Sequence, residues 1–170
     1  MELTNRETWT LIHGMIIGTF FLLAFAGGLA GLWSFRTELV TPEGIHERLR
    51  RLKIGTWTMA IAAWATVITG TWIVYPWYRE TTPTSAKSIL LADPDTKDWH
   101  TFGMEWKEHI AWLSPMLATV AAFLVVYYGT SLTRNRRARI LVLSFFVAGF
   151  ATAAIAGLFG ALITKAAPVR

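Results

Sequence analysis

The segment from residue 98 to residue 112, DWHTFGMEWKEHIAW, gathers residue types that could do chemistry. It holds two of the four histidines of the chain, three acidic residues, one lysine and three tryptophans. Imidazole nitrogens bind metals and exchange protons near neutral pH. A further histidine, His13, lies near the N-terminus at the start of a long apolar run. These side chains indicate ligand or proton chemistry, and the helices that carry them decide which.

The surrounding sequence is apolar enough to belong in a membrane. Apolar residues make up 54% of the chain and charged residues only 16%, against about 25% in soluble domains. Four apolar stretches approach or exceed the roughly 20 residues that cross a bilayer. We predict an all-α integral membrane protein, with residues 1–170 forming a single four-helix transmembrane domain. The expected helices cover about residues 8–34, 54–75, 105–128 and 140–163, with an outer loop at 76–104.

Two sequence features refine these helices. Pro76 follows the second apolar stretch and is expected to end that helix, because proline lacks the backbone N–H that an interior position needs. The fourth stretch carries two rows of small residues spaced four apart, which include Gly149, Gly157 and Gly160. Such rows allow close helix packing. They could serve either the bundle itself or a partner subunit.

The distribution of charge predicts the orientation in the membrane. Nine of the sixteen lysine and arginine residues lie in the connections after the first and third helices, with only three acidic residues beside them. Short basic connections face the cytoplasm. We therefore expect an up-down bundle in a prokaryotic plasma (inner) membrane, with both termini outside. Anionic lipid head groups account for the basic excess, so no nucleic acid is expected as a partner.

Several kinds of site are excluded by residue type. The chain has no cysteine, which removes disulfides, iron–sulfur clusters, thiolate zinc sites and covalently attached haem. It also lacks the H-E-x-x-H, G-x-S-x-G and phosphate-loop motifs. We therefore expect a non-catalytic electron-transfer or accessory subunit rather than a hydrolytic enzyme.

His13 and His109 are the candidate ligands of a haem b. Each lies roughly five residues into its helix, and the first and third helices of an up-down bundle are diagonal partners about 11–14 Å apart. Neutral imidazoles facing each other across such a gap are suitable axial ligands. Phe20 on the helix face below His13, with Trp112 and Met116 on the third helix, would form the porphyrin walls. Arg6, Arg79 and Lys107 are close enough in depth to meet propionates at the outer interface.

At the level of architecture, this arrangement resembles the four-helix membrane b-type cytochromes. The resemblance rests on His13 and His109 at matched depth and implies an electron-transfer function. Such proteins commonly carry two haems, but this chain has no second pair of membrane histidines, since His46 lies in a connection. The resemblance therefore implies one haem at most.

Other interpretations of the same residues stay open. His100, Met104 and His109, with His13 and Met15, could form an outward-facing copper site, because imidazole and thioether ligands suit Cu(I). The tryptophans with His109 and Glu108 could instead border a quinol pocket, or form an ordinary interfacial aromatic belt. Both histidines could also be packed or interfacial residues without a ligand.

Two functional hypotheses follow. In the first, the chain is a membrane electron-transfer subunit that binds one haem b near the outer face and exchanges electrons with quinol or a periplasmic redox protein. In the second, it is a cofactor-free accessory subunit that docks onto other membrane subunits of a larger respiratory or photosynthetic complex. An absorption spectrum separates the two.

Overall fold

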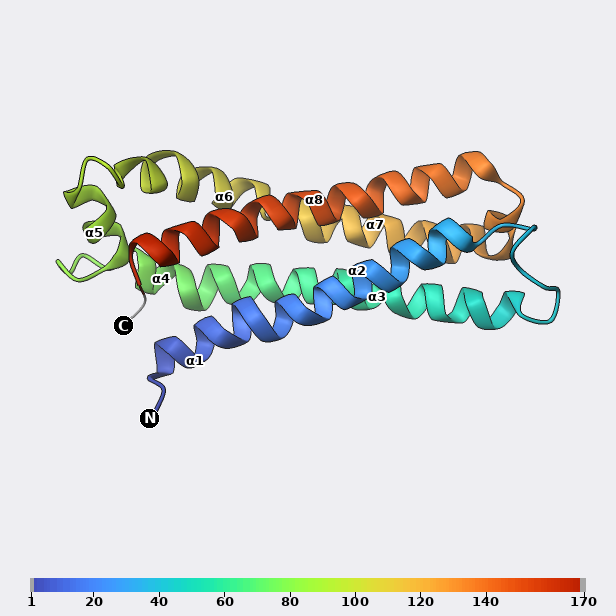
Figure 1. Ribbon diagram of the computed structural model, residues 1–170, viewed down its shortest axis with the longest axis horizontal. Coiled ribbons are helices and arrows are strands. Elements are labelled where there is room, and N and C mark those ends of the chain that lie inside the picture. Colours follow the sequence, from blue (N-terminus) through green and yellow to red (C-terminus); the bar gives the residue numbers. More distant parts are fainter. Residues whose placement is uncertain (1, 169–170) are drawn as a thin grey trace.

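Four long helices pack side by side in a computed structural model, which describes residues 2–168 (Figure 1). Among those residues there is no strand. The segments long and apolar enough to cross a membrane are Asn5–Ser34, Ile45–Tyr78, Trp99–Thr133 and Arg136–Ala166. These helices confirm the prediction of an all-helical, multi-pass membrane protein.

Each of the first three spans combines α-helix with an irregular helical segment. The first span contains α1 (Asn5–Leu11), the π-helical η1 (Ile12–Ile16) and α2 (Ile17–Ser34). The second contains α3 (Ile45–Thr69), the π-helical η2 (Gly70–Val74) and α4 (Tyr75–Tyr78). After α5 (Ala86–Ala92), the third contains the π-helical η3 (Trp99–Met104), α6 (Glu105–Ile110), α7 (Leu113–Tyr128) and the 3-10 helix η4 (Gly129–Thr133). The fourth span is the single helix α8 (Arg136–Ala166).

The spans are longer than the apolar stretches alone predict, because polar residues continue and cap the helices. At the start of α1, the Thr4 hydroxyl accepts a hydrogen bond from the Glu7 backbone at 3.2 Å. The Glu7 carboxylate accepts in return from the Thr4 backbone at 2.8 Å. This capping box satisfies N–H groups that a helix start leaves free. Hydropathy detects the membrane-embedded part of a helix and misses such polar ends.

The expected stop at Pro76 is wrong. The second span continues through Pro76 as α4 and ends at Tyr78. Pro76 lies in the first turn of α4, after the π-helical segment η2, where the Tyr75 N–H bonds to the Gly70 carbonyl. A proline in the first turn of a helix gives up no hydrogen bond that the helix requires. The interruption that precedes Pro76 therefore lets the helix pass it.

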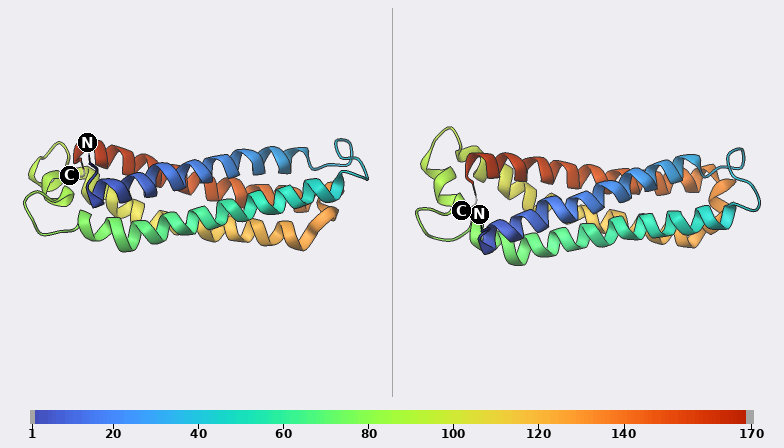
Figure 2. Two further views of the ribbon diagram at one scale, coloured as in Figure 1. Left: turned by 90° about the horizontal axis from the view of Figure 1, so that it is seen from below. Right: turned by 60° about the horizontal axis from the view of Figure 1, so that its bottom comes forward.

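The main contacts between spans run from α2 to α3, from α3 to α7, from α7 to α8 and back from α8 to α2. The first and third spans are therefore diagonal to each other. The N and C marks lie at the same end of the long axis in Figure 1, and this end is called the termini end below. The segment with α5 caps the bundle at that end (Figure 2).

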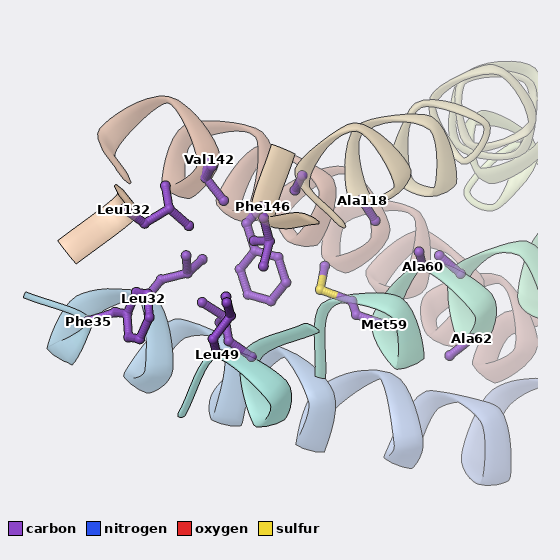
Figure 3. Close-up of a cluster of buried hydrophobic side chains, with 14 of the residues drawn as sticks. Leu32, Phe35, Leu49, Met59, Ala60, Ala62, Ala118, Leu132, Val142 and Phe146 are labelled. Atoms are coloured by element: carbon purple, nitrogen blue, oxygen red, sulfur yellow. The ribbon is translucent and has the colours of Figure 1, made fainter. Parts of the chain in front are cut away.

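An apolar core fills the half of the bundle remote from the termini. Leu32, Met59, Val142 and Phe146 are buried and converge there from three spans (Figure 3). The Phe25 ring of α2 stacks on Phe150 of α8 with ring centroids 3.8 Å apart. These contacts hold the first span to the fourth in this half of the molecule.

The termini end has its own, smaller apolar cluster. Tyr78, Leu90, Met104 and Ile163 are buried together, with Leu90 of α5 fully enclosed. Between the two clusters, α1 and η1 contribute no buried residue at all. The polar side chains of the sequence analysis lie in this loosely packed region and at the termini end.

Candidate functional site

Within residues 2–168, three π-helical segments place two histidines and a glycine in the termini half of the bundle. His13 lies in η1, Gly70 in η2 and His100 in η3. A π-helical turn inserts one extra residue into an α-helix and is frequent at functional sites. Because the insertion changes the angular position of every residue beyond it, it can aim a side chain that a regular helix would direct elsewhere.

His13 is held between the first and second spans by one hydrogen bond. Its Nδ1 lies 2.9 Å from the hydroxyl oxygen of Thr69. The single hydrogen of that hydroxyl is donated to the Ala65 carbonyl at 2.7 Å, so Thr69 accepts from His13. The His13 ring therefore carries its proton on Nδ1 and a free lone pair on Nε2.

Gly70 makes room for this ring. A Cβ at Gly70 would stand 3.0 Å from Cε1 of His13, so the imidazole would have to shift by a few tenths of an ångström to admit it. The glycine thus lets the imidazole lie directly against the second span. The orientation of His13 depends on two neighbouring residues of that span, Thr69 and Gly70.

Lys107 reaches toward the same region from the third span. It is half-buried, and its terminal carbon and nitrogen lie against Gly160 of α8, where an added Cβ would be 3.3 Å from Cε and 3.5 Å from Nζ. Across residues 2–168, no hydrogen bond or ion pair engages its ammonium. The free Nε2 lone pair of His13 and the free ammonium of Lys107 therefore both lie in the termini half of the bundle.

A charged network joins the second span to α6 nearer the surface. Nη2 of Arg79 binds a carboxylate oxygen of Glu105 at 2.5 Å and one of Glu108 at 3.1 Å. The guanidinium also lies over the Tyr75 ring, 5.0 Å from its centroid. Burial alone would lower the pKa of Arg79, but the hydrogen bonds to Glu108 and Glu105 raise it above its ordinary value. Arg79 therefore stays charged and ties α4 to α6.

His100 lies in the apolar cluster at the termini end. Its Nδ1 is 2.8 Å from the hydroxyl of Tyr78, and both side chains are buried. Met104, one helical turn further on, is buried as well. Within the described part of the chain, no three His, Asp or Glu side chains are grouped as metal ligands. A copper site with His100 and Met104 stays a prediction.

His109 faces away from the interior. It is exposed, and its Nδ1 donates to the Glu105 carbonyl of its own helix at 2.6 Å. Lys107 precedes it by two residues, which is about 200° around an α-helix. Because the end of Lys107 lies against Gly160 of α8, His109 lies on the opposite side of α6. Like His13, it keeps a free lone pair on Nε2, but the two rings lie on different faces.

The remaining predicted pocket residues are dispersed. Arg6 pairs with Glu80 at 2.6 Å, and its guanidinium lies over Trp77. Phe20 and Met116 are exposed, and Phe20 borders a shallow apolar groove of about 280 Å³ between the first two spans. Trp112 contacts the rings of Trp64 and Trp72 edge to face. These side chains do not form one pocket, and Arg6 and Phe20 lie about 21 Å apart along the first span, at 1.5 Å per residue.

Sequence reasoning missed the residue that orients His13. Thr69 carries no motif, and many threonines in membrane helices bond only to their own backbone. The nearest signal is the small residue beside it, Gly70. Its position opposite His13 becomes visible only once the first two spans are packed.

Comparison with protein-family models, with curated proteins and with solved structures finds no match in any of the three. Function is therefore inferred from the arrangement of His13, Thr69, Lys107 and the charged network around Arg79.

Proposed function

We propose that this protein is a membrane electron-transfer subunit that binds one haem b in the termini half of the bundle through His13. One observation carries the proposal. His13 is located within a membrane-spanning segment, and Thr69 fixes its tautomer so that Nε2 presents a free lone pair. A metal-binding imidazole normally donates its other N–H to a neighbouring oxygen in this way.

The surrounding residues suit the group. No residue of α1 or η1 is fully buried, and His13 itself is half-buried, so this end of the first span is not enclosed by the apolar core. The free ammonium of Lys107 offers a positive charge for a propionate at the same depth. Haem b supplies one-electron chemistry when bound. In this chain Thr69 would orient the ligand, and Lys107 would offer its charge while α6 keeps the orientation that places this side chain against Gly160.

His109 is the proposed second ligand, and it would require α6 to turn about its own axis. This helix has only six residues and is bounded by η3 on one side and by a turn at 111–112 on the other. Pro115 lacks the N–H that would bond to the Ala111 carbonyl, which accounts for the break before α7. These two irregular segments are where such a rotation would be accommodated.

The proposed setting is a prokaryotic plasma (inner) membrane, with an up-down bundle and the termini end outside. The support is the charge distribution, since the connections at the opposite end carry most of the basic residues. Quinol or a periplasmic redox protein is the proposed exchange partner. Glu108 and Glu105 provide carboxylates at the termini end that could accept protons from a quinol.

This orientation can be tested by labelling, because the protein has no cysteine of its own. Thr84→Cys places a thiol in the exposed connection at the termini end, and Glu43→Cys places one at the opposite end. We expect a membrane-impermeant maleimide to label Thr84→Cys in intact cells and Glu43→Cys only after permeabilisation. The reverse pattern would show that the termini lie in the cytoplasm.

A second candidate function is an accessory subunit without a cofactor in a larger membrane complex. His109 favours it, because this ring faces away from His13 on the outer side of α6. Phe102 and Trp106, from the same part of the third span, are also exposed and stack with ring centroids 6.2 Å apart. An aromatic outer face of this kind suits contact with another membrane subunit.

A reduced-minus-oxidised absorption spectrum of the purified protein decides between the two. The protein is produced with haem precursor in excess and purified in a mild detergent. We expect the α band of a b-type haem at a stoichiometry of one per chain. A protein that purifies folded and colourless under these conditions would refute the electron-transfer proposal and leave the accessory role.

A further inference from the structure

The end of the bundle opposite the termini carries arginines of two kinds. Of the eight arginines at this end, five form ion pairs or hydrogen bonds. Arg50 and Arg51 bind Glu47, while Arg36, Arg48 and Arg139 donate to backbone carbonyls. Over residues 2–168, the side chains of the other three, Arg134, Arg136 and Arg137, form no hydrogen bond or ion pair. All three are exposed and lie within four residues of one another.

These three arginines border a single open depression of about 770 Å³. The rest of its lining is Thr130, Ser131 and Asn135. The side-chain oxygen of Asn135 accepts from the Ala138 backbone at 3.0 Å, which leaves its amide N–H groups free. The depression is therefore lined by guanidinium, amide and hydroxyl groups, and no carboxylate lines it. Guanidinium groups pair with phosphate oxygens through two parallel hydrogen bonds.

The position of the depression identifies the source of the phosphate. It lies where the third span ends and the fourth begins, so it is at the depth of lipid head groups. Tyr127 is highly exposed on one side, and Ile140 and Leu141 are exposed on the other. Tyrosine rings at the end of a membrane helix lie at the head-group level. A phospholipid can therefore place its phosphate among the arginines while its acyl chains lie along α7 and α8.

We propose that residues 130–137 form a binding site for the phosphate of an anionic phospholipid. The site is independent of haem binding, since it lies at the other end of the bundle. Its selectivity for an anionic lipid arises from three uncompensated positive charges. A zwitterionic phosphatidylcholine carries its own ammonium group, which these charges would repel.

The test measures lipid retention by native mass spectrometry of the full-length protein in micelles. Phosphatidylglycerol, phosphatidylcholine and inorganic phosphate are titrated separately. We expect preferential retention of phosphatidylglycerol by the wild type. The triple change Arg134→Gln, Arg136→Gln and Arg137→Gln should weaken this binding about a hundredfold, since each arginine near an anionic lipid surface contributes substantially to affinity.

A matched control removes the same charge at the same end. In it, Arg36, Arg50 and Arg51 are changed to glutamine. We expect the affinity of this variant for phosphatidylglycerol to stay within about threefold of the wild-type affinity. Equal weakening in both triple variants would overturn the proposal, because it would show a diffuse charge effect. Equal retention of phosphatidylcholine, or saturation by inorganic phosphate that excludes the lipid, would overturn it as well.

Discussion

His13→Ala is expected to abolish the b-type α band of the purified protein. Under the proposed function, His13 would hold the haem through its Nε2 lone pair, and alanine offers no replacement. The change removes one partly buried ring and leaves the apolar core near Phe146 untouched, so helical content should persist. The measurement is the reduced-minus-oxidised spectrum, with circular dichroism of the same sample as a check of folding.

His46→Ala is the matched control for this experiment. His46 is exposed near the start of α3, at the opposite end of the bundle. We expect its spectrum to equal that of the wild type. Haem that survives in His13→Ala at full stoichiometry would show that the ligand assignment is wrong.

His109→Ala then tests whether α6 turns when haem is present. Loss of the α band in this variant would support bis-histidine ligation and therefore a rotated α6. A band that keeps its intensity and position would show that His109 remains on the outer face of the helix. In that case the second ligand must be sought among other residues of the termini half of the bundle.

Gly149→Leu is expected to lower the free energy of unfolding by about 3 kcal/mol, the upper part of the usual cost of overpacking. A Cβ at Gly149 would stand 3.2 Å from the Ala118 backbone nitrogen and 3.3 Å from the Ser114 carbonyl oxygen. These are backbone atoms of α7, and no side-chain rotation can move them away. Leucine at this position must therefore push α7 and α8 apart and loosen the buried alanines between them.

Gly157→Leu provides the control on the same helix. It lies on α8 eight residues later and belongs to the same row of small residues, but an added Cβ there meets nothing within 4 Å. We expect a change within about 0.5 kcal/mol, as for substitutions away from packed contacts. Both variants can be compared by denaturant titration in mixed micelles. Equal destabilisation of the two would contradict the close approach of α7 and α8 at Gly149.

The comparison of these two glycines shows what a small-residue row can and cannot predict. Gly149 and Gly157 are equivalent in the sequence pattern, and either could have faced a partner helix. In the structure Gly149 lies against the backbone of α7, Gly160 lies against Lys107, and Gly157 is exposed. The pattern predicts that α8 can pack closely, but the contact itself depends on how the helix is rotated in the bundle.

Sequence alone was sufficient for the number and approximate place of the membrane helices. The apolar stretches that bury themselves in lipid must be long and nearly uncharged, and this requirement is visible in the residues. The predicted helices were shorter than the spans at their polar ends, because hydropathy does not measure capping contacts. The predicted stop at Pro76 was wrong, because hydropathy does not reveal the π-helical η2 that precedes it.

Only the tertiary structure decided which side of each helix faces the interior. A membrane helix is apolar all round, so its sequence contains little signal for its rotation about its own axis. His109 and Lys107 have nearly the same depth, yet Lys107 lies against Gly160 of α8 while His109 is exposed. Packing of the spans and the irregular turns in η1, η2 and η3 set these directions. The sequence determined that histidines occur at this depth, and the packing determined that Thr69 and Gly70, rather than His109, lie beside His13.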